Sequence, residues 1–318
     1  MAHASSDSEK RQRSLVGCRL LVTGAAGQLG TYLRVVLAET GAEVIGTGSK
    51  AGDGIDIVAD LTDAEAVRRA IGQAAPEIVI HAAAFTDVDG AEREPERAHA
   101  VNAAGSRYLA EGVRDAGAHL IAVGTDFVFA GDGDAPYAED ATPRPLSVYG
   151  ASKLAGERAI LETDPAFAVA RTAWLYGGAG KHFPRTVLGV VRDRGGIAVV
   201  ADEIGSPTFA GDLALALVDL ARYQGSGIFH LVNEGRVSRF DFAQAVAAAG
   251  GLDPSLVTAT TTAEFLAKYP LPARRPADST LVNTRARALG IALRPWREAV
   301  EVYLPRLATE MRQLARQS

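Results

Sequence analysis

Apolar residues along this chain fall either into short unbroken runs or at helical spacing, and the two patterns alternate. Runs at 19–23, 43–46, 77–82, 119–124 and 167–171 predict buried β-strands. Between them, apolar residues recur every three or four positions, which predicts helices over 28–40, 63–74, 95–116 and 149–163. This alternation predicts an α/β fold with a Rossmann-like, doubly wound parallel sheet that has helices on both faces.

The second half of the chain is less regular. We expect helices over 183–194 and 212–223, strands over 197–200 and 228–232, and further helices that begin near Phe240 and Arg297. Thr62 and Glu65 have the spacing of a capping box, so we expect them to start the helix over 63–74. We interpret 1–16 as a disordered extension and 17–172 as the Rossmann domain. Residues 173–318 would form mainly a smaller C-terminal α/β lobe, with some segments returning to the first domain.

Composition and charge narrow the classes of protein. The 318 residues are 47% hydrophobic and carry a net charge of −5, so neither nucleic acid nor an acidic membrane surface is an expected partner. No apolar stretch has the roughly 18 residues that span a bilayer, and residues 1–14 lack the apolar centre of a secretion signal. The single cysteine, Cys18, allows no disulfide within the chain, and we expect it to be buried. These features favour the cytoplasm.

A glycine-rich turn follows the first predicted strand. Gly24, Gly27, Gln28, Leu29 and Gly30 lie in the sequence GAAGQLG, which leads directly into a predicted helix. Glycines let the backbone approach a pyrophosphate, and the helix N-terminus offers N–H groups to it. In this context the motif predicts a dinucleotide site, with a merely tight strand–helix turn as the alternative.

The residues after the second strand bear on the choice of cofactor. NAD-binding units usually have a carboxylate there for the ribose 2′-hydroxyl. This chain has Ser49 and Lys50, which could hold a 2′-phosphate, although a solvated surface lysine would give the same sequence. We therefore expect NADP(H) to be preferred, with NAD(H) left open. Asp60 and Leu61 are candidates for the adenine end of the site, unless Asp60 only leads into the next helix.

Tyr149 and Lys153 lie one helical turn apart and share a helix face. A lysine there can lower the pKa of the phenol and hold the nicotinamide ribose. A tyrosine with an ordinary pKa near 10 is a poor acid–base catalyst at neutral pH without such help. With Thr125 at the end of an upstream strand, the pair predicts reduction of a ketone. Hydride transfer needs no metal, and we expect none.

These residues resemble the extended short-chain dehydrogenase/reductase superfamily, and within it the dTDP-4-dehydrorhamnose reductase family. The resemblance covers about residues 19–303. Its marks are GAAGQLG at 24–30, HAAAFTDVDGAE at 81–92, GTDFVF at 124–129, YGASKLAGE at 149–157, RTAWLYG at 171–177, DEIGSPT at 202–208 and RPADSTL at 275–281. The Tyr/Lys pair is shared by the superfamily, whereas RTAWLYG and DEIGSPT are more specific to the family.

The resemblance implies a reaction and a set of contacts. Thr125 would hydrogen-bond the substrate carbonyl, Tyr149 would protonate its oxygen, and NADPH would deliver hydride to C4 of a nucleotide-linked 4-keto-6-deoxyhexose. The further cofactor contacts implied are Ala82, Ala83 and Ala84. The substrate contacts implied are Thr86, Val88, Asp126, Phe127, Trp174, His182, Ile204, Gly205, Ser206, Pro207 and Arg275. Trp174 could instead pack in the core. Arg275 could bind the diphosphate or lie on the surface. A homodimer is also possible.

Two departures from the family leave the sugar open. Phe127 stands where the family usually has tyrosine, and His182, which could bond a phosphate or face water, stands where it often has asparagine. Because side chains alternate along a strand, Thr125 and Phe127 should point to the same side. The alternatives are an epimerase or dehydratase of the superfamily, or a non-catalytic NADP-binding regulatory subunit. Phe127 replaces a carboxylate typical of dehydratases, and an intact set of Thr125, Tyr149 and Lys153 argues against the regulatory subunit.

Overall fold

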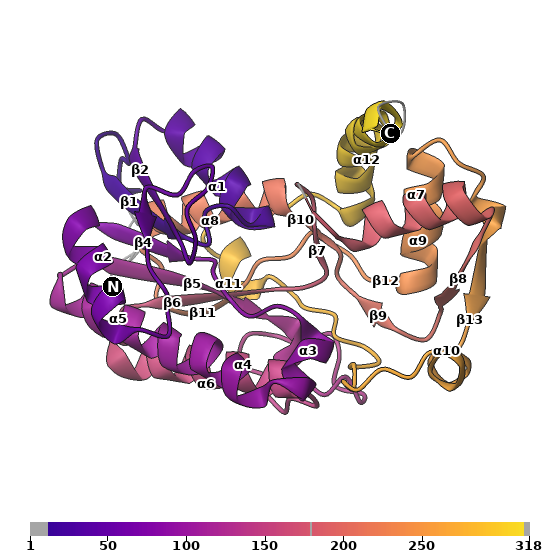
Figure 1. Ribbon diagram of the computed structural model, residues 1–318, viewed down its shortest axis with the longest axis horizontal. Helices are drawn as coiled ribbons and strands as arrows, with labels where there is room; N and C mark the ends of the chain where they lie inside the picture. The colour runs from indigo at the N-terminus through magenta and orange to yellow at the C-terminus, as the bar shows by residue number, and fades with distance from the viewer. Residues whose placement is uncertain (1–11, 179, 315–318) are drawn as a thin grey trace, which may run out of the picture.

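The computed structural model describes residues 12–178 and 180–314. A seven-stranded sheet forms its centre, and every strand pairs in parallel with its neighbours (Figure 1). In spatial order the strands are β11 (Gly227–His230), β6 (Ala168–Thr172), β5 (His119–Thr125), β4 (Ile78–His81), β1 (Arg19–Thr23), β2 (Glu43–Gly48) and β3 (Ile57–Val58). This sheet confirms the predicted α/β, Rossmann-like fold.

Helices cover both faces of the sheet because its strands are apolar on both sides. Leu20 and Val22 of β1 belong to the core beneath α1 (Gln28–Glu39) and α8 (Ala210–Tyr223). Leu21, which lies between them in the strand, belongs to a second core on the opposite face of the sheet, beneath three further helices. These are α2 (Ala64–Ala74), α5 (Ser106–Asp115) and α6 (Val148–Thr163). The alternation of side chains along each strand thus divides its apolar residues between two cores.

The cap expected for α2 is wrong by one residue. Asp63 caps the helix, because its carboxylate accepts the N–H groups of Glu65 and Ala66 at 2.9 and 3.1 Å. The Thr62 hydroxyl instead donates to Asp60 at 2.8 Å. An aspartate is a strong N-cap residue, and here it satisfies two otherwise unpaired helix donors.

The single helix expected over 95–116 is also wrong in detail. The segment consists of α4 (Pro95–His99), a π-helix (Ala100–Gly105) and α5, and a helix that we did not expect, α3 (Val88–Arg93), precedes it. The π-helical turn brings Gly105 against the Leu61 turn, where an added Cβ would lie 2.9 Å from the Leu61 Cβ. Periodicity in the sequence does not distinguish such a turn from an α-helix.

A smaller lobe lies to one side of the sheet (Figure 1). Its core is formed by α7 (Phe183–Arg194), α9 (Arg239–Ala249) and α12 (Trp296–Leu314), with β8 (Ile197–Val200) paired in parallel with β13 (Val257–Thr260). The remaining short elements of the described chain, in either part, are β7 (Leu175–Tyr176), β9 (Ile204–Gly205), β10 (Thr208–Phe209), β12 (Val237–Ser238), α10 (Thr262–Lys268) and α11 (Thr284–Arg287), with 3-10 turns at Asp126–Val128 and Pro254–Leu256. From the second half, α8, β11 and α11 pack with the first core, as do Ile291 and Leu293 after α11.

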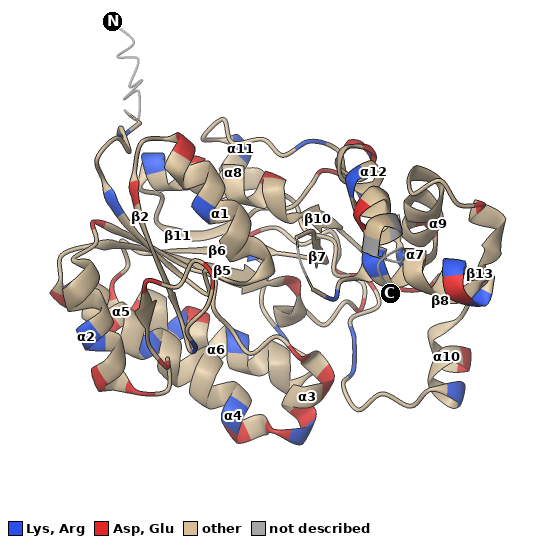
Figure 2. Cartoon of the chain, turned by 45° about the horizontal axis from the view of Figure 1, so that its top comes forward, with Lys and Arg blue, Asp and Glu red and all other residues tan. Residues whose placement is uncertain are grey.

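The start of the described chain packs against the first domain. Residues 1–11 of the expected extension lie outside the described residues. Leu15 is buried, and the Arg13 backbone N–H donates to the Arg222 carbonyl at 2.8 Å. Cys18 is buried, as expected. No helix within 12–178 or 180–314 is long and apolar enough to cross a membrane, and acidic and basic residues are interspersed on outer helices such as α3 and α4 (Figure 2).

Candidate active site

A cleft of about 1200 Å³ lies at the carboxyl ends of the parallel strands. Thr23, Thr47, Thr125 and Thr172, which stand at or near the ends of four strands, line it, and Trp174 and Arg239 line it from the lobe. The expected site residues among its lining are Gly24, Gly27, Gln28, Leu29, Gly30, Ser49, Lys50, Asp60, Leu61, Ala82, Ala83, Ala84, Thr86, Val88, Thr125, Asp126, Phe127, Tyr149, Lys153 and Trp174. This is the position at which open α/β sheets bind their ligands.

The glycine turn at one end of the cleft has no room for side chains. Gly24 has a φ of +67°, and a Cβ there would lie 2.9 Å from the Ala83 backbone. A Cβ at Gly30 would lie 2.2 Å from the Gly24 carbonyl oxygen. Gly27, the N-cap of α1, provides no side-chain hydrogen bond, and the first turn of α1 holds no acidic residue. The N–H groups at this helix end are therefore available to an anion.

The next part of the cleft lies beyond β2. Ser49 and Lys50 are exposed there and line the cleft. Asp60 lines it too, but its carboxylate also accepts the backbone N–H and the hydroxyl of Thr62 at 2.9 and 2.8 Å. Asp60 thus shapes the turn that leads into α2, which is the alternative we left open for it.

The far end of the cleft brings Tyr149 and Lys153 to Thr125. Ser147 caps α6 by accepting the Gly150 N–H at 3.2 Å. A Cβ at Gly150 would lie 2.2 Å from the Phe127 carbonyl oxygen, so α6 lies directly on the turn that follows β5. The Lys153 ammonium donates to the Val123 carbonyl of β5 at 2.8 Å.

The pKa of Tyr149 moves opposite to our expectation. Burial raises the pKa of Tyr149 to about 12, although a hydrogen bond from Thr125 opposes the shift. Burial also lowers the pKa of Lys153 to about 8. We expected Lys153 to lower the pKa of the phenol, but its ammonium is bound to a backbone carbonyl. A phenol with this pKa remains protonated at neutral pH, which suits a proton donor.

Asp126 and Phe127 lie on a turn rather than on the strand. β5 ends at Thr125 and a 3-10 turn follows, so the alternation argument that we used for Phe127 is wrong. Phe127 nevertheless lines the same cleft, with its ring edge-on to Tyr149 at 5.4 Å between centroids. The Asp126 carboxylate accepts the Ser279 and Thr125 hydroxyls at 2.5 and 3.2 Å. Burial raises the pKa of Asp126 to about 6.

Sequence reasoning missed Asn102, which ties the site together from the π-helical turn. Its amide accepts the Phe85 N–H at 2.8 Å, and donates to the Phe85 carbonyl at 3.1 Å and the Ser152 hydroxyl at 3.0 Å. A Cβ at Gly156 would lie 2.1 Å from the Asn102 carbonyl, so α6 packs tightly against this turn. π-Helical turns occur often at functional sites, but nothing in the spacing of this segment signals one.

A buried ion pair anchors α6 to the sheet. Arg171 of β6 donates Nε and Nη2 to one carboxylate oxygen of Glu157 at 3.0 and 2.9 Å, and the two side chains are 1% and 4% exposed. These residues end YGASKLAGE and begin RTAWLYG. Loss of one partner of such a pair costs about 3–5 kcal/mol because the other charge stays buried. The two sequence blocks therefore meet at a contact that fixes the Tyr149 helix.

The DEIGSPT block, residues 202–208, packs against Trp174 at Gly205. Trp174 lines the cleft at a φ of +43°, unusual for a bulky residue, and its ring covers Gly205, where a Cβ would lie 2.6 Å away. Ser206 is fully buried, and its hydroxyl accepts the Leu281 N–H at 3.3 Å. Ile204, Ser206 and Pro207, expected as substrate contacts, are outside the lining of the cleft that the described residues form. Glycine at 205 is needed because the indole ring occupies the position of a side chain.

His182 and Arg275 have other partners. His182 is 6% exposed, accepts the Arg185 N–H at 3.3 Å as the N-cap of α7, and hydrogen-bonds the Tyr303 hydroxyl at 3.0 Å. It neither faces water nor lines the cleft formed by the described residues. Burial lowers the pKa of His182 to about 4. Arg275 forms an ion pair with Asp89 at 2.7 Å and is also outside the lining of the cleft that the described residues form.

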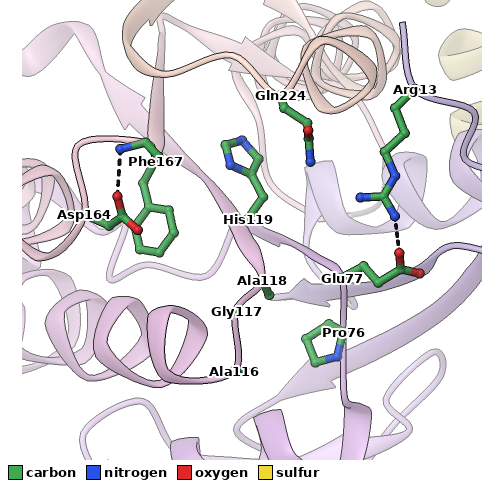
Figure 3. Close-up of a pocket in the computed structure, with 11 residues that line it drawn as sticks. Arg13, Pro76, Glu77, Ala116, Gly117, Ala118, His119, Asp164, Phe167 and Gln224 are labelled. Atoms are coloured by element: carbon green, nitrogen blue, oxygen red, sulfur yellow. Dashed lines mark hydrogen bonds and ion pairs between the residues drawn. The ribbon is translucent and has the colours of Figure 1, made fainter.

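A second hollow, of about 300 Å³, lies at the opposite end of the sheet (Figure 3). Glu77 and His119, at the amino ends of β4 and β5, line it together with Gln224 and Arg13, which forms an ion pair with Glu77. The glycine turn and the Tyr149 helix lie at the other ends of the strands. Parallel α/β folds place their chemistry at those carboxyl ends, so the cleft described above is the candidate site.

The cleft thus joins a dinucleotide-type glycine turn to a threonine, a tyrosine and a lysine. A parallel sheet with this set of groups at its carboxyl edge defines the chain as a short-chain dehydrogenase/reductase of the extended type.

Comparison with known proteins narrows the class to one family. The RmlD substrate binding domain family matches residues 18–309, and the chain belongs to this family, that of the dTDP-4-dehydrorhamnose reductases. The dTDP-4-dehydrorhamnose reductase of Mycolicibacterium smegmatis is 40% identical over 302 residues, 93% of this chain and 88% of the relative. A Streptomyces antibioticus protein named "Probable dTDP-4,6-dihydroxy-2-methyloxan-3-one 4-ketoreductase" is 43% identical over 290 residues, 90% and 95% of the two chains.

A solved structure agrees over the same extent. The Bacillus anthracis dTDP-4-dehydrorhamnose reductase in complex with NADP superposes with a TM-score of 0.83 at 34% identity, covering 92% of this chain and 98% of that one.

Proposed function

We propose that this chain reduces the C4 ketone of a dTDP-4-keto-6-deoxyhexose with NADPH. The observation that carries the proposal is the joint lining of one cleft by the glycine turn and by Thr125, Tyr149 and Lys153. Membership of the reductase family and likeness to an NADP complex support it. A homodimer in the cytoplasm, where NADPH and nucleotide sugars are available, belongs to the same proposal.

The residues of the cleft fit a phosphorylated dinucleotide. Gly24 and Gly30 leave a backbone cradle that a Cβ would fill, and the end of α1 offers N–H groups. Thr47 and Thr172 line the cleft with buried hydroxyls that have no partner among the described residues. No carboxylate follows β2 directly, and Lys50, two residues after β2, would bind a 2′-phosphate.

Each reacting group then has a role. Bound NADPH supplies the hydride that reduces the ketone. Thr125 orients the C4 carbonyl oxygen, and Tyr149 transfers its phenolic proton to that oxygen as the negative charge develops. Burial keeps Tyr149 protonated until that moment. Lys153 is held by the Val123 carbonyl in the same cleft, where it would bind the nicotinamide ribose of the cofactor.

The test is turnover of the full chain with NADPH and a panel of dTDP-4-keto-6-deoxyhexoses. We expect NADPH absorbance to fall in proportion to the loss of the C4 carbonyl. NMR of the product measures that loss. Tyr149→Phe serves as the background control. Binding of NADPH without consumption by any sugar would support a regulatory subunit instead. Conversion of the sugar without net oxidation of NADPH would identify an epimerase.

A further inference from the structure

Arg239 brings a cation into the cleft that the sequence motifs did not indicate. It is the first residue of α9, which Ser238 caps by accepting the Asp241 N–H at 2.9 Å. The Arg239 backbone N–H donates to the Glu203 carbonyl at 2.8 Å, which fixes the start of the helix. From this position its side chain lines the same cleft as Trp174, Asp126 and Tyr149.

The guanidinium group is held on two sides. Its Nε donates to a Glu203 carboxylate oxygen at 3.0 Å, and its carbon atom Cζ lies 3.9 Å from the centroid of the Trp174 ring. The Phe183 ring lies 5.2 Å away. The side chain is 23% exposed. An arginine held by a carboxylate and stacked on an indole ring is well ordered for recognition.

The other edge of the guanidinium is free. Neither Nη1 nor Nη2 of Arg239 has a hydrogen-bond partner among the residues that the structure describes. Four of its five N–H donors therefore remain available to a ligand in the cleft that Arg239 lines. A ligand that removes water from these donors must supply oxygen acceptors in return.

The charges around Arg239 indicate what kind of acceptor fits. The groups that interact with it electrostatically are Glu203, Asp126 and Arg275. Glu203 and Asp126 are acidic and offset the charge of the guanidinium, while Arg275 is itself paired with Asp89. A cluster whose positive charge is already compensated attracts a dianion weakly and suits a neutral hydroxyl. Asp126 adjoins Thr125, which places the cluster beside the reacting end of the site.

We propose that Arg239 is a specificity-determining residue that donates hydrogen bonds from its free guanidinium edge to a ring hydroxyl of the hexose. This proposal rests on the function proposed above. It assigns sugar recognition to a residue of the lobe that packs on Trp174, while Thr125 and Tyr149 act on the ketone. The diphosphate of the substrate is then bound elsewhere.

The experiment compares Arg239→Met and Arg239→Lys with a matched control, Arg236→Met. Arg236 is three residues away, forms an ion pair with Asp278, is 55% exposed and is outside the cleft lining. The substrates are dTDP-4-dehydrorhamnose and its 2-deoxy and 3-deoxy analogues, with dTDP as an inhibitor that carries the diphosphate but no sugar. Unfolding temperature and the Kd for NADPH report on the integrity of each variant.

We expect Arg239→Met to lower kcat/KM about 5- to 150-fold for each sugar that carries the recognised hydroxyl, and to leave the analogue that lacks it within a factor of two. Arg239→Lys should restore part of the loss, and Arg236→Met should change nothing. The Ki for dTDP should stay the same in all variants. An equal loss for every sugar, or a weakened dTDP Ki, would overturn the proposal, the latter by assigning Arg239 to the diphosphate.

Calorimetry separates this proposal from the proposed function. The Kd of dTDP-rhamnose, which carries no ketone, can be measured without turnover. If the wild-type protein turns over no 4-keto sugar, the proposed function is wrong. Weaker binding of dTDP-rhamnose to Arg239→Met would still support the hydroxyl contact, and unchanged binding would reject it.

Discussion

Replacing Tyr149 with phenylalanine separates chemistry from folding at this site. The ring is half-buried and packs edge-on against Phe127, and phenylalanine keeps both its volume and that contact. The Thr125 hydroxyl keeps Asp126 as an acceptor at 3.2 Å and still accepts the Phe127 N–H at 3.3 Å, so the change leaves no new buried group without a partner. We therefore expect a loss of stability below about 1 kcal/mol.

The effect on rate should be far larger. General acid catalysis contributes about 10²- to 10⁴-fold, which corresponds to roughly 3–5 kcal/mol of transition-state stabilisation. kcat for the ketone should fall by that factor, while the Kd for NADPH changes less than twofold because the phenol acts on the substrate. Single-turnover oxidation of NADPH measures the first quantity and fluorescence titration measures the second.

A matched control is Tyr176→Phe. Tyr176 is a buried tyrosine whose hydroxyl has no partner among the described residues, and it lies in the core of the lobe. This variant should retain the wild-type kcat. Wild-type turnover by Tyr149→Phe, or an equal loss in both variants, would refute the assignment of Tyr149 as the proton donor.

Three further predictions test the cofactor, the sugar and the buried histidines. Ser49→Asp should reverse or abolish the preference for NADPH, because a carboxylate repels a 2′-phosphate and accepts from a 2′-hydroxyl; a wild type with the higher kcat/KM for NADH would contradict this reading. Phe127→Tyr should favour fully hydroxylated dTDP-4-dehydrorhamnose over its deoxy analogues by about 5- to 150-fold, and an unchanged ratio of kcat/KM would show that Phe127 does not contact the sugar. Burial lowers the pKa of His81 and His230 to about 3, so only the unfolded chain gains these protons as pH falls below 6.5, and stability is lost. His230→Phe should reduce the slope of the unfolding free energy between pH 6 and pH 5 by about 1 kcal/mol per pH unit; equal slopes for wild type and His230→Phe would argue against the burial effect.

The chain pattern predicted the elements that are regular in themselves. The remaining helices and strands expected from periodicity begin and end within two residues of their positions in the structure, as β8 (Ile197–Val200) and α7 (Phe183–Arg194) show. Short elements such as β3 (Ile57–Val58) and α11 (Thr284–Arg287) escaped because two to four residues carry no period. The π-helical turn escaped because its apolar spacing is that of a helix, and the tight approach of Gly156 to Asn102 at this turn joins segments that are distant in the sequence.

The sequence by itself determined the parallel fold, the glycine turn and the pairing of Tyr149 with Lys153, because strand period, glycine geometry and helical spacing are all local properties. Tertiary structure alone decided the direction of the Tyr149 pKa, since that depends on burial and on where the Lys153 ammonium finds an acceptor. It also decided that Arg239 lines the cleft while Arg275 is paired with Asp89. Both arginines look alike in the sequence. Which of them can reach a ligand depends on where the folded chain places each guanidinium relative to the cleft.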